Sequence, residues 1–267
     1  MRLPPAGRRH YAMSTYRDYA PFYDGSGQIR FALLTAHYLA EVLARHPPPA
    51  APRRALDLAC GTGTLALSIA EDGWSVVGVD LSEEMLALAR AKARGGGVGR
   101  RASFVPGDIR GPLALRPASF GLVTCTYDSL NYLLIEGDLG RCFAAAARAL
   151  APGGLLYADM NTRHFLEHDW PACEVEEQSG FVQVSQSRFD PATDTSSMRL
   201  TVLSGDDERG YQRVDETHVE RAYPPETVAA LLERAGLRVE AAYECFTFQP
   251  HHPRSQRIAW VARRDAI

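Results

Sequence analysis

Short apolar runs alternate with segments of helical periodicity along residues 54–159, and this alternation limits the folds open to the chain more than any other feature. Neighbouring parallel strands need a crossover connection, and a helix between them supplies it. The pattern therefore predicts an α/β fold in which helices cover both faces of a parallel sheet. The expected strands are residues 54–58, 75–79, 102–105, 121–125 and 155–159, and the expected helices between them are residues 65–71, 83–94 and 139–150.

The residues before and after this region follow other patterns. An amphipathic helix is expected at residues 28–45, and the proline-rich residues 47–52 form a linker after it. Beyond residue 160, polar and apolar residues alternate, which is typical of an antiparallel sheet with one solvated face. The expected elements there are extended segments at 174–188, 197–205 and 211–221, a helix at 225–235, and closing strands at 237–246 and 257–262.

These patterns divide the chain into three parts. Residues 1–15 are expected to be a disordered tail, and Met13 is a second candidate start of translation beside Met1. Residues 16–160 together with 223–267 form one predicted domain. Residues 161–222 form a predicted β-lid, a small antiparallel sheet inserted between the two parts of that domain.

Composition excludes several kinds of partner. The 29 lysines and arginines and the 32 aspartates and glutamates give a formal net charge of -3, so the basic surface that nucleic acids or acidic membranes require is absent. No apolar run approaches the roughly 18 residues of a membrane span, and residues 1–13 lack the apolar core of a signal peptide. The five cysteines form no C-x-x-C motif, which favours a reducing, cytoplasmic location. The sequence leaves a homodimer open.

Residues 55–66 contain the most informative motif, a strand that runs into a glycine turn and then into a helix. Gly61 and Gly63 remove side chains where a ligand would have to approach the backbone. The following helix offers unpaired N–H groups and the positive end of its dipole. A tight strand–helix turn without a ligand has the same pattern, so the motif needs support from other residues.

Aspartates at the expected carboxyl ends of strands supply that support. Asp80 ends the second strand, 23 residues after Asp57, where a carboxylate can accept hydrogen bonds from both hydroxyls of a ribose. Asp108 follows the third strand, where it can accept from the exocyclic amine of an adenine, with Ile109 against the ring. The three acids in this order indicate a ligand that contains adenosine.

Asp57 separates two candidate ligands. A dinucleotide such as NAD would place its pyrophosphate on the glycine turn, where the Asp57 carboxylate would repel it. S-adenosyl-L-methionine (AdoMet) has no phosphate there, and it carries an ammonium group that a carboxylate attracts. Asp57 therefore favours AdoMet, and an NAD-dependent enzyme remains the minor alternative.

The motifs at Asp57–Gly63, Asp80, Gly107-Asp108 and Leu150–Leu156 resemble those of class I AdoMet-dependent methyltransferases. The resemblance implies a Rossmann-like sheet of seven strands whose last strand is antiparallel. The predicted β-lid resembles that of glycine and aminosugar N-methyltransferases and of uncharacterised bacterial relatives. The residues that the resemblance assigns to AdoMet are Tyr16, Tyr23, Asp57, Ala59, Gly61, Gly63, Asp80, Leu81, Met85, Asp108, Ile109 and Thr126.

The resemblance also implies a role for the aromatic segment near the N-terminus. Residues Tyr16–Asp24 look like the Y-x-x-x-A-x-x-Y-D entrance segment of small-molecule members, in which an aromatic side chain closes over the cofactor. An equal alternative is that Tyr19, Phe22 and Tyr23 anchor the first helix. One tyrosine could close the site while another anchors the segment.

The segment at residues 124–133 passes, in this family, between the sulfonium and the methyl acceptor. Thr126 and Asp128 are therefore expected to line the methyl-transfer site, whereas Tyr132 and Leu133 are expected in the core. For Asn131, a helix cap and a site role are equal alternatives. A base is needed only if the nucleophile arrives protonated, and the candidates are Asp128, His164, His168 and His218.

Metal-dependent chemistry is the weaker interpretation of these residues. His164 and His168 are four residues apart and could share a helical face, but no third ligand is evident. A catechol-type O-methyltransferase would have an adjacent Asp-Asn pair, whereas Met160 separates Asp159 from Asn161 here. The sequence therefore predicts no metal site.

The predicted reaction is in-line transfer of the methyl group from AdoMet to a nitrogen or oxygen atom of a small molecule, with S-adenosyl-L-homocysteine as the product. Packing within the lid is the main expectation for the aromatic side chains of the lid and its flank. If they instead face an acceptor pocket, they would suit an amine or a flat phenol; they are Phe181, Tyr211, His218 and Tyr223. The alternatives are a non-catalytic AdoMet-binding protein and a methyltransferase that acts on RNA or protein.

Overall fold

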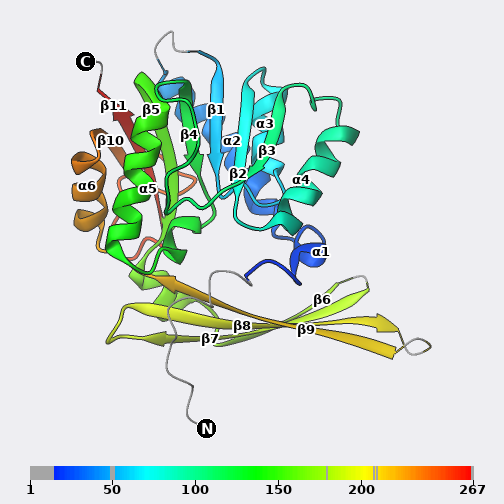
Figure 1. Ribbon diagram of the computed structural model, residues 1–267. Helices are drawn as coiled ribbons and strands as arrows, with labels where there is room; N and C mark the ends of the chain where they lie inside the picture. Colours follow the sequence, from blue (N-terminus) through cyan, green and yellow to red (C-terminus); the bar gives the residue numbers. More distant parts are fainter. Residues whose placement is uncertain (1–14, 49–51, 179, 207, 209, 266–267) are drawn as a thin grey trace.

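Seven strands form one mixed sheet, as predicted from the sequence (Figure 1). The structure is a computed structural model, and it describes residues 15–48, 52–178, 180–206, 208 and 210–265. The strand order is β10-β11-β5-β4-β1-β2-β3. Strands β1 to β5 are parallel, and β11 is antiparallel to both of its neighbours, so the last strand is antiparallel. The bounds are β1 (Arg54–Leu58), β2 (Ser75–Asp80), β3 (Ala102–Pro106), β4 (Phe120–Cys125), β5 (Leu150–Asn161), β10 (Leu237–Glu244) and β11 (Arg257–Arg264). Residues 1–14 of the expected tail lie outside the described residues.

Helices cover both faces of this sheet and bury two apolar cores. One core contains Leu139 and Phe143 of α5 with Leu231 of α6, and the other contains Leu39 of α2 with Ile69 of α3. Among the described residues, no helix combines the length and apolarity needed to cross a membrane. The helices are α1 (Ala20–Tyr23), α2 (Ile29–Arg45), α3 (Thr64–Glu71), α4 (Glu83–Gly95), α5 (Glu136–Ala149) and α6 (Pro225–Arg234), with the short η1 (Ser129–Tyr132) and the π-helical η2 (Phe165–Asp169).

The fifth strand begins earlier than its sequence suggests. Phe120 of β4 pairs with Leu150, and the next pair joins Leu122 to Leu155. Residues 151–154 therefore bulge out of the ladder, with Gly153 at a positive φ of 76°. The Pro-Gly-Gly motif at residues 152–154 thus forms a bulge inside β5, and the strand begins at Leu150, before the expected start at residue 155.

A second sheet of four antiparallel strands lies below the first in Figure 1, with α1 between the two sheets. The single extended segment expected at 174–188 is two strands, because Gln178 pairs with Phe181 and Gly180 adopts a φ of 93°. The strands of this second sheet are β6 (Cys173–Gln178), β7 (Phe181–Asp190), β8 (Thr195–Asp206) and β9 (Gly210–Arg221).

The face of β9 that points toward the rest of the molecule is polar. Glu216, His218 and Glu220 alternate along the strand and are each at most 7% exposed. Buried charged groups of this kind need partners, because burial without them is costly. The partners of these three side chains lie in the candidate site.

Glu240 of β10 joins the end of α2 to β11, and its replacement by glutamine provides a test of the fold. Its carboxylate accepts from Arg263 at 2.6 Å, from Arg238 at 3.0 Å and from His46 at 3.0 Å. Hydrogen bonds from Arg263 are the main reason that the pKa of Glu240 is lowered to about 2. We expect Glu240→Gln to lower the free energy of unfolding by about 1.5–3 kcal/mol at pH 7.

That loss should depend on pH in a defined direction. A lowered pKa in the folded state stabilises the protein above the unfolded pKa of about 4.3, and the contribution disappears as the pH falls toward 2. Urea denaturation at pH 7 and pH 3 measures the difference, with the exposed Glu233→Gln as control. An equal loss at both pH values would contradict the assignment.

Candidate active site

The glycine turn between β1 and α3 leaves open space beside one of its two glycines. Gly61 has a φ of 53°, and a Cβ atom placed there would meet nothing within 4 Å. At Gly63, with a φ of 75°, a Cβ atom would lie 2.8 Å from both Ala89 and Phe104. Gly63 is therefore required for the packing of α3, whereas Gly61 faces the space that a ligand would use. Ala59 also has a positive φ, 54°, a conformation uncommon outside glycine.

Asp80 organises this turn. Its Oδ2 accepts the N–H of Gly61 at 2.7 Å, and its Oδ1 accepts the N–H of Ser82 at 2.9 Å. Ser82 caps α4, because its hydroxyl accepts the N–H of Met85 at 3.2 Å. The carboxylate of Asp80 is thus held at the carboxyl end of β2, beside the open space at Gly61.

Asp57 lies deeper, one strand away from Asp80. It is 2% exposed, and its Oδ1 accepts the hydroxyl of Thr124 at 2.6 Å. Burial raises the pKa of Asp57 to about 7, the Thr124 hydrogen bond opposes the rise, and the negative charge of Asp80 adds to it. A cation near this carboxylate would favour its ionised form.

The residues expected around an adenine occupy the rim next to β3. The guanidinium of Arg110 donates to both oxygens of Asp108, with contacts of 2.6–3.0 Å, and these hydrogen bonds lower the pKa of Asp108. Ile109 is half-buried, and Leu81 is 48% exposed, an apolar surface beside the acids. Met85 is 2% exposed, so it lies below this surface.

Residues 16–24 lie over the glycine turn and are held there by charged groups that the sequence analysis did not identify. Asp24 accepts the Thr62 hydroxyl at 2.7 Å and forms an ion pair with Lys92 at 2.7 Å. Glu216 of β9 accepts the backbone N–H groups of Tyr16 at 2.8 Å and Tyr19 at 3.0 Å. This segment therefore connects the two sheets.

Two tyrosines of this segment differ in position. Tyr19 is 3% exposed and its hydroxyl donates to Gln183 of β7 at 2.8 Å, so it anchors the segment. The Tyr16 hydroxyl lies 2.9 Å from that of Tyr132, and the Tyr16 ring is 5.8 Å from that of Tyr23. Tyr16 and Tyr23 are thus brought together near the end of β4.

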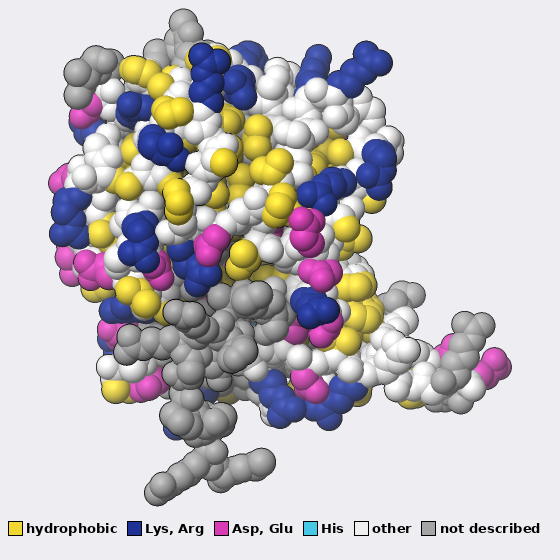
Figure 2. All heavy atoms as spheres, viewed as in Figure 1, with side chains coloured by type: hydrophobic (Ala, Val, Ile, Leu, Met, Phe, Trp, Pro, Cys, Tyr) yellow, Lys and Arg dark blue, Asp and Glu magenta, His cyan; other side chains and the backbone are white. Residues whose placement is uncertain are grey.

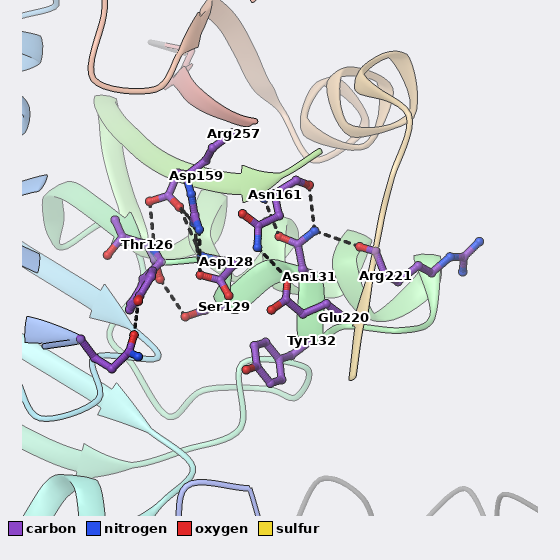
Figure 3. A network of polar contacts seen from close by, with 12 residues as sticks. Thr126, Asp128, Ser129, Asn131, Tyr132, Asp159, Asn161, Glu220, Arg221 and Arg257 are labelled. Atoms are coloured by element: carbon purple, nitrogen blue, oxygen red, sulfur yellow. Dashed lines mark hydrogen bonds and ion pairs between the residues drawn. The ribbon is translucent and has the colours of Figure 1, made fainter. Parts of the chain in front are cut away.

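The segment after β4 carries the most concentrated polar network (Figure 3). Tyr127 and Asp128 both have positive φ, and their N–H groups donate to the two oxygens of Asp159 at 3.0 and 3.2 Å. Arg257 of β11 contacts Asp159 and lies 3.2 Å from Asp128 Oδ1. The guanidinium therefore lies between two carboxylates, Asp159 on β5 and Asp128 in the segment after β4.

Glu220 of β9 completes this network. The Asn161 amide donates to Glu220 Oε2 at 2.8 Å, and a side-chain hydrogen bond joins Glu220 to Asp128. Burial and the charge of Asp128 raise the pKa of Glu220 well above its usual range. Two carboxyl groups can share a hydrogen bond only if one of them keeps a proton, and the contact of Arg257 with Asp128 favours the charge on Asp128 and the proton on Glu220.

Neighbouring residues serve both the network and the core. Asn131 donates to the carbonyls of Asn161 and Arg221 and so joins η1, β5 and β9, whereas a helix cap had been one alternative. Leu133 is buried as expected. The Tyr132 hydroxyl instead faces the site, 3.1 Å from His218 Nδ1, where core packing alone was expected.

The candidate bases do not all come together. Asp128 and His218 lie in one network through Tyr132 and Glu220. His164 instead contacts His168 and Asp169 and lines a separate cavity of about 400 Å³, and no described contact joins it to Asp128. Within the described residues, no group of three or more His, Cys, Asp or Glu side chains is arranged to hold a metal ion.

The remaining expected positions are also clear. Thr126 is half-buried at the end of β4, and its carbonyl accepts the Ser129 hydroxyl at 2.8 Å. Of the aromatics for which lid packing or an acceptor pocket was possible, Tyr223 is buried and donates to the Leu133 carbonyl, and Phe181 packs on Phe22. Tyr211 is 62% exposed on β9, so it lines no pocket wall.

Comparison with known proteins agrees with this geometry. A family model described as a methyltransferase domain matches residues 55–154. The Bacillus subtilis protein named "Putative methyltransferase YqeM" is 30% identical over 215 residues, which cover 79% of this chain and 84% of that protein. A dTDP-3-amino-3,4,6-trideoxy-alpha-D-glucopyranose N,N-dimethyltransferase of Streptomyces venezuelae is 27% identical, over 83% of this chain and 89% of that protein.

A solved structure extends the comparison to the fold. The structure of an S-adenosylmethionine-dependent methyltransferase from Clostridium acetobutylicum superposes with a TM-score of 0.81 at 26% identity, over 93% of this chain and 98% of that one. The fold and the site therefore define a class I AdoMet-dependent methyltransferase. This chain belongs to that family, it is an enzyme of that class, and AdoMet is its methyl donor.

Proposed function

We propose that the enzyme transfers the methyl group of AdoMet to a nitrogen or oxygen atom of a small molecule, which binds between the glycine turn and the second sheet. The observation that carries the proposal is the polar face of β9, where Glu216, His218 and Glu220 lie opposite the end of β4. The sugar-directed relative supports a small acceptor. In this proposal residues 161–222 form the lid of a domain made of 16–160 and 223–267.

The residues around the turn fit AdoMet by charge and shape. Asp80 is placed to accept the ribose hydroxyls, Asp57 to attract the ammonium group, and Asp108 with Ile109 to hold the adenine. Gly61 leaves the open space that such a ligand needs. In this proposal Tyr16 and Tyr23 close over it, and their segment is held between β9 and α4.

The protein's contribution to the reaction is positioning. AdoMet supplies a methyl group that is already activated by its sulfonium. The two sheets hold the acceptor against that methyl group and exclude water, and orientation of this kind is worth roughly 7–11 kcal/mol of the barrier. Thr126 and Asp128 line the path between the end of β4 and the lid.

The proposal has a direct test. Calorimetry with AdoMet and S-adenosylhomocysteine measures binding, and transfer of a tritiated methyl group to pools of amines, phenols, RNA and protein identifies the acceptor class. Transfer to the small-molecule pools is expected. Binding without transfer to any pool would indicate a non-catalytic AdoMet-binding protein, and transfer to RNA or protein alone would also contradict the proposal.

The raised pKa of Asp57 predicts a pH dependence of AdoMet affinity. The carboxylate must be ionised to attract the ammonium group, so the affinity should rise severalfold between pH 6 and pH 7.5, through the pKa of about 7. In Asp57→Asn the affinity should be lower and nearly independent of pH over that range. Calorimetry at four pH values checks this, and an equal pH dependence in both proteins would contradict it.

The cellular location and the oligomeric state of the protein are further parts of the proposal. Among the described residues the five cysteines are free, which supports a reducing, cytoplasmic location. The net charge of -3 supports a partner other than nucleic acid. A homodimer stays a proposal that light scattering can test.

A further inference from the structure

The paired carboxyl groups of Asp128 and Glu220 take no part in the AdoMet contacts proposed above. Glu220 is 1% exposed, and the Asp128 side chain is 14% exposed. Arg257 contacts Asp128, so the negative charge of the pair lies on Asp128, and the raised pKa of Glu220 keeps that carboxyl group protonated. This charge lies after β4, where the acceptor is expected to bind.

The surroundings of the pair supply too little positive charge. Arg257 contacts Asp128 through Oδ1, and the same guanidinium also contacts Asp159. The other titratable groups near the pair carry no charge at neutral pH. Burial raises the pKa values of four tyrosines and lowers the pKa of His218 to about 4; the tyrosines are Tyr16, Tyr23, Tyr127 and Tyr132. Asp128 and Asp159 thus share one guanidinium, an arrangement that favours a further bound cation.

Hydrogen-bond acceptors also exceed donors at this position. The Asn161 side chain reaches the pair, since its Nδ2 donates to Glu220, yet its Oδ1 is buried without a partner among the described residues. Asn161 is 4% exposed, so solvent does not supply a hydrogen-bond partner for its Oδ1. A buried acceptor left unpaired costs about 1–3 kcal/mol, which a ligand that donates hydrogen bonds would recover.

Aromatic rings complete a site suited to a cation. The Tyr16 ring lies 6.0 Å from Tyr132 and 4.9 Å from His218, and Tyr132 stands close to Glu220 in Figure 3. The faces of tyrosine rings attract ammonium groups. A protonated amine offers positive charge and two or three N–H donors, whereas a phenol offers one donor and no charge.

We propose that Asp128, supported by Glu220 and Asn161, binds the methyl acceptor as a protonated amine and takes the proton that this amine must lose. The inference rests on the proposed function and specifies its substrate class. Arg257 holds Asp128 in place from the opposite side, as the dashed contacts of Figure 3 show.

The proposed step is a proton transfer followed by the methyl transfer. One N–H proton of the ammonium group moves to the Asp128 carboxylate and leaves a neutral amine with a free lone pair. That lone pair forms the new N–C bond while the S–C bond of AdoMet breaks, and the electron pair of the broken S–C bond stays on sulfur. The products are S-adenosylhomocysteine and the methylated ammonium, and Asp128 later releases its proton to water.

A binding experiment tests this without requiring turnover. The protein saturated with S-adenosylhomocysteine is titrated with a library of aminosugars, arylethylamines and aliphatic amines, each matched with the compound in which a hydroxyl replaces the amine. We expect at least one amine to bind at least tenfold more tightly than its hydroxyl counterpart. The same amine should bind Asp128→Asn at least tenfold more weakly than the unchanged protein.

One further variant separates loss of charge at the site from loss of charge elsewhere on the protein. Glu177→Gln, an exposed carboxylate on β6, is the matched control and should change nothing. Near-ultraviolet circular dichroism confirms that each variant is folded.

Several outcomes would overturn the inference. They are a hydroxyl compound that binds as tightly as its amine, unchanged amine binding in Asp128→Asn, and a library in which no amine binds. The amine–hydroxyl comparison uses the unchanged protein, so it holds even if a variant fails to fold. AdoMet binding by the unchanged protein, measured in parallel, distinguishes this failure from failure of the proposed function.

Discussion

Replacing Arg257 by methionine is expected to lower the free energy of unfolding by about 3–5 kcal/mol at pH 7.5. Arg257 lies between Asp128 and Asp159, whose side chains are 14% and 0% exposed. It also stacks over the rings of Phe31 at 4.5 Å and Tyr127 at 5.5 Å. Methionine fills part of the volume but leaves two buried carboxylates without a cation. Thermal unfolding should record a decrease in Tm of roughly 10 °C.

The same variant should recover stability as the pH falls from 7.5 to 5. Burial raises the pKa of Asp128, and the charge of Arg257 opposes that rise. Without Arg257 the pKa of Asp128 rises further, so protonation at lower pH removes the uncompensated charge. The exposed Arg254→Met is the control and should stay within about 0.5 kcal/mol. A loss that is the same at both pH values would show that lost packing, and not charge, is the cause.

Replacing Asp80 by alanine is expected to weaken AdoMet binding by more than tenfold. In the proposed function this carboxylate accepts the two ribose hydroxyls, and charged hydrogen bonds are worth about 1.5–3 kcal/mol each. The structure adds a second reason, because Asp80 also accepts the N–H groups of Gly61 and Ser82. Removing it therefore also releases the turn beside which the cofactor is proposed to bind. Calorimetry with AdoMet and with S-adenosylhomocysteine measures the effect.

The control for this variant is Glu83→Gln, an exposed acid in the first turn of α4 that pairs with Arg90. It has the same charge change near the same strand end, so any general effect of lost negative charge would be visible in it. We expect its dissociation constant to stay within threefold of that of the unchanged protein. An unchanged dissociation constant in Asp80→Ala would place the ribose elsewhere.

The elements that sequence patterns predicted well are those specified by neighbouring residues. The alternation of apolar runs and helical segments correctly predicted a parallel arrangement of β1 to β5. The acids at the strand ends lie on the same rim of the sheet as the glycine turn. In the fifth strand, the difference from the sequence analysis comes from a partner strand. The bulge at Gly153 exists because Leu150 pairs with Phe120 of β4, a contact that local pattern does not contain.

The lid face shows the same limit more sharply. Alternation predicted that β9 has a buried face, and a buried face is ordinarily apolar. In this structure it carries Glu216, His218 and Glu220, whose partners are up to 200 residues away in the chain. His218 was singled out as a histidine in the predicted lid, but nothing around the two glutamates in the sequence indicated their roles. His164 was singled out on similar grounds and lies in another cavity.

The sequence by itself determined the class of the protein, because the strand–turn–helix motif and its spaced aspartates are local and their chemistry follows from residue type. Only the tertiary structure shows which side chains surround the proposed acceptor position. The antiparallel register of β11 pairs Arg257 with Asn161 and so brings the guanidinium to Asp128 and Asp159, while β9 supplies Glu220 from across the molecule. Such contacts depend on the pairing of strands that lie far apart in the chain, and burial then sets the charge of each group. The local sequence pattern therefore predicts neither the contacts nor the charges.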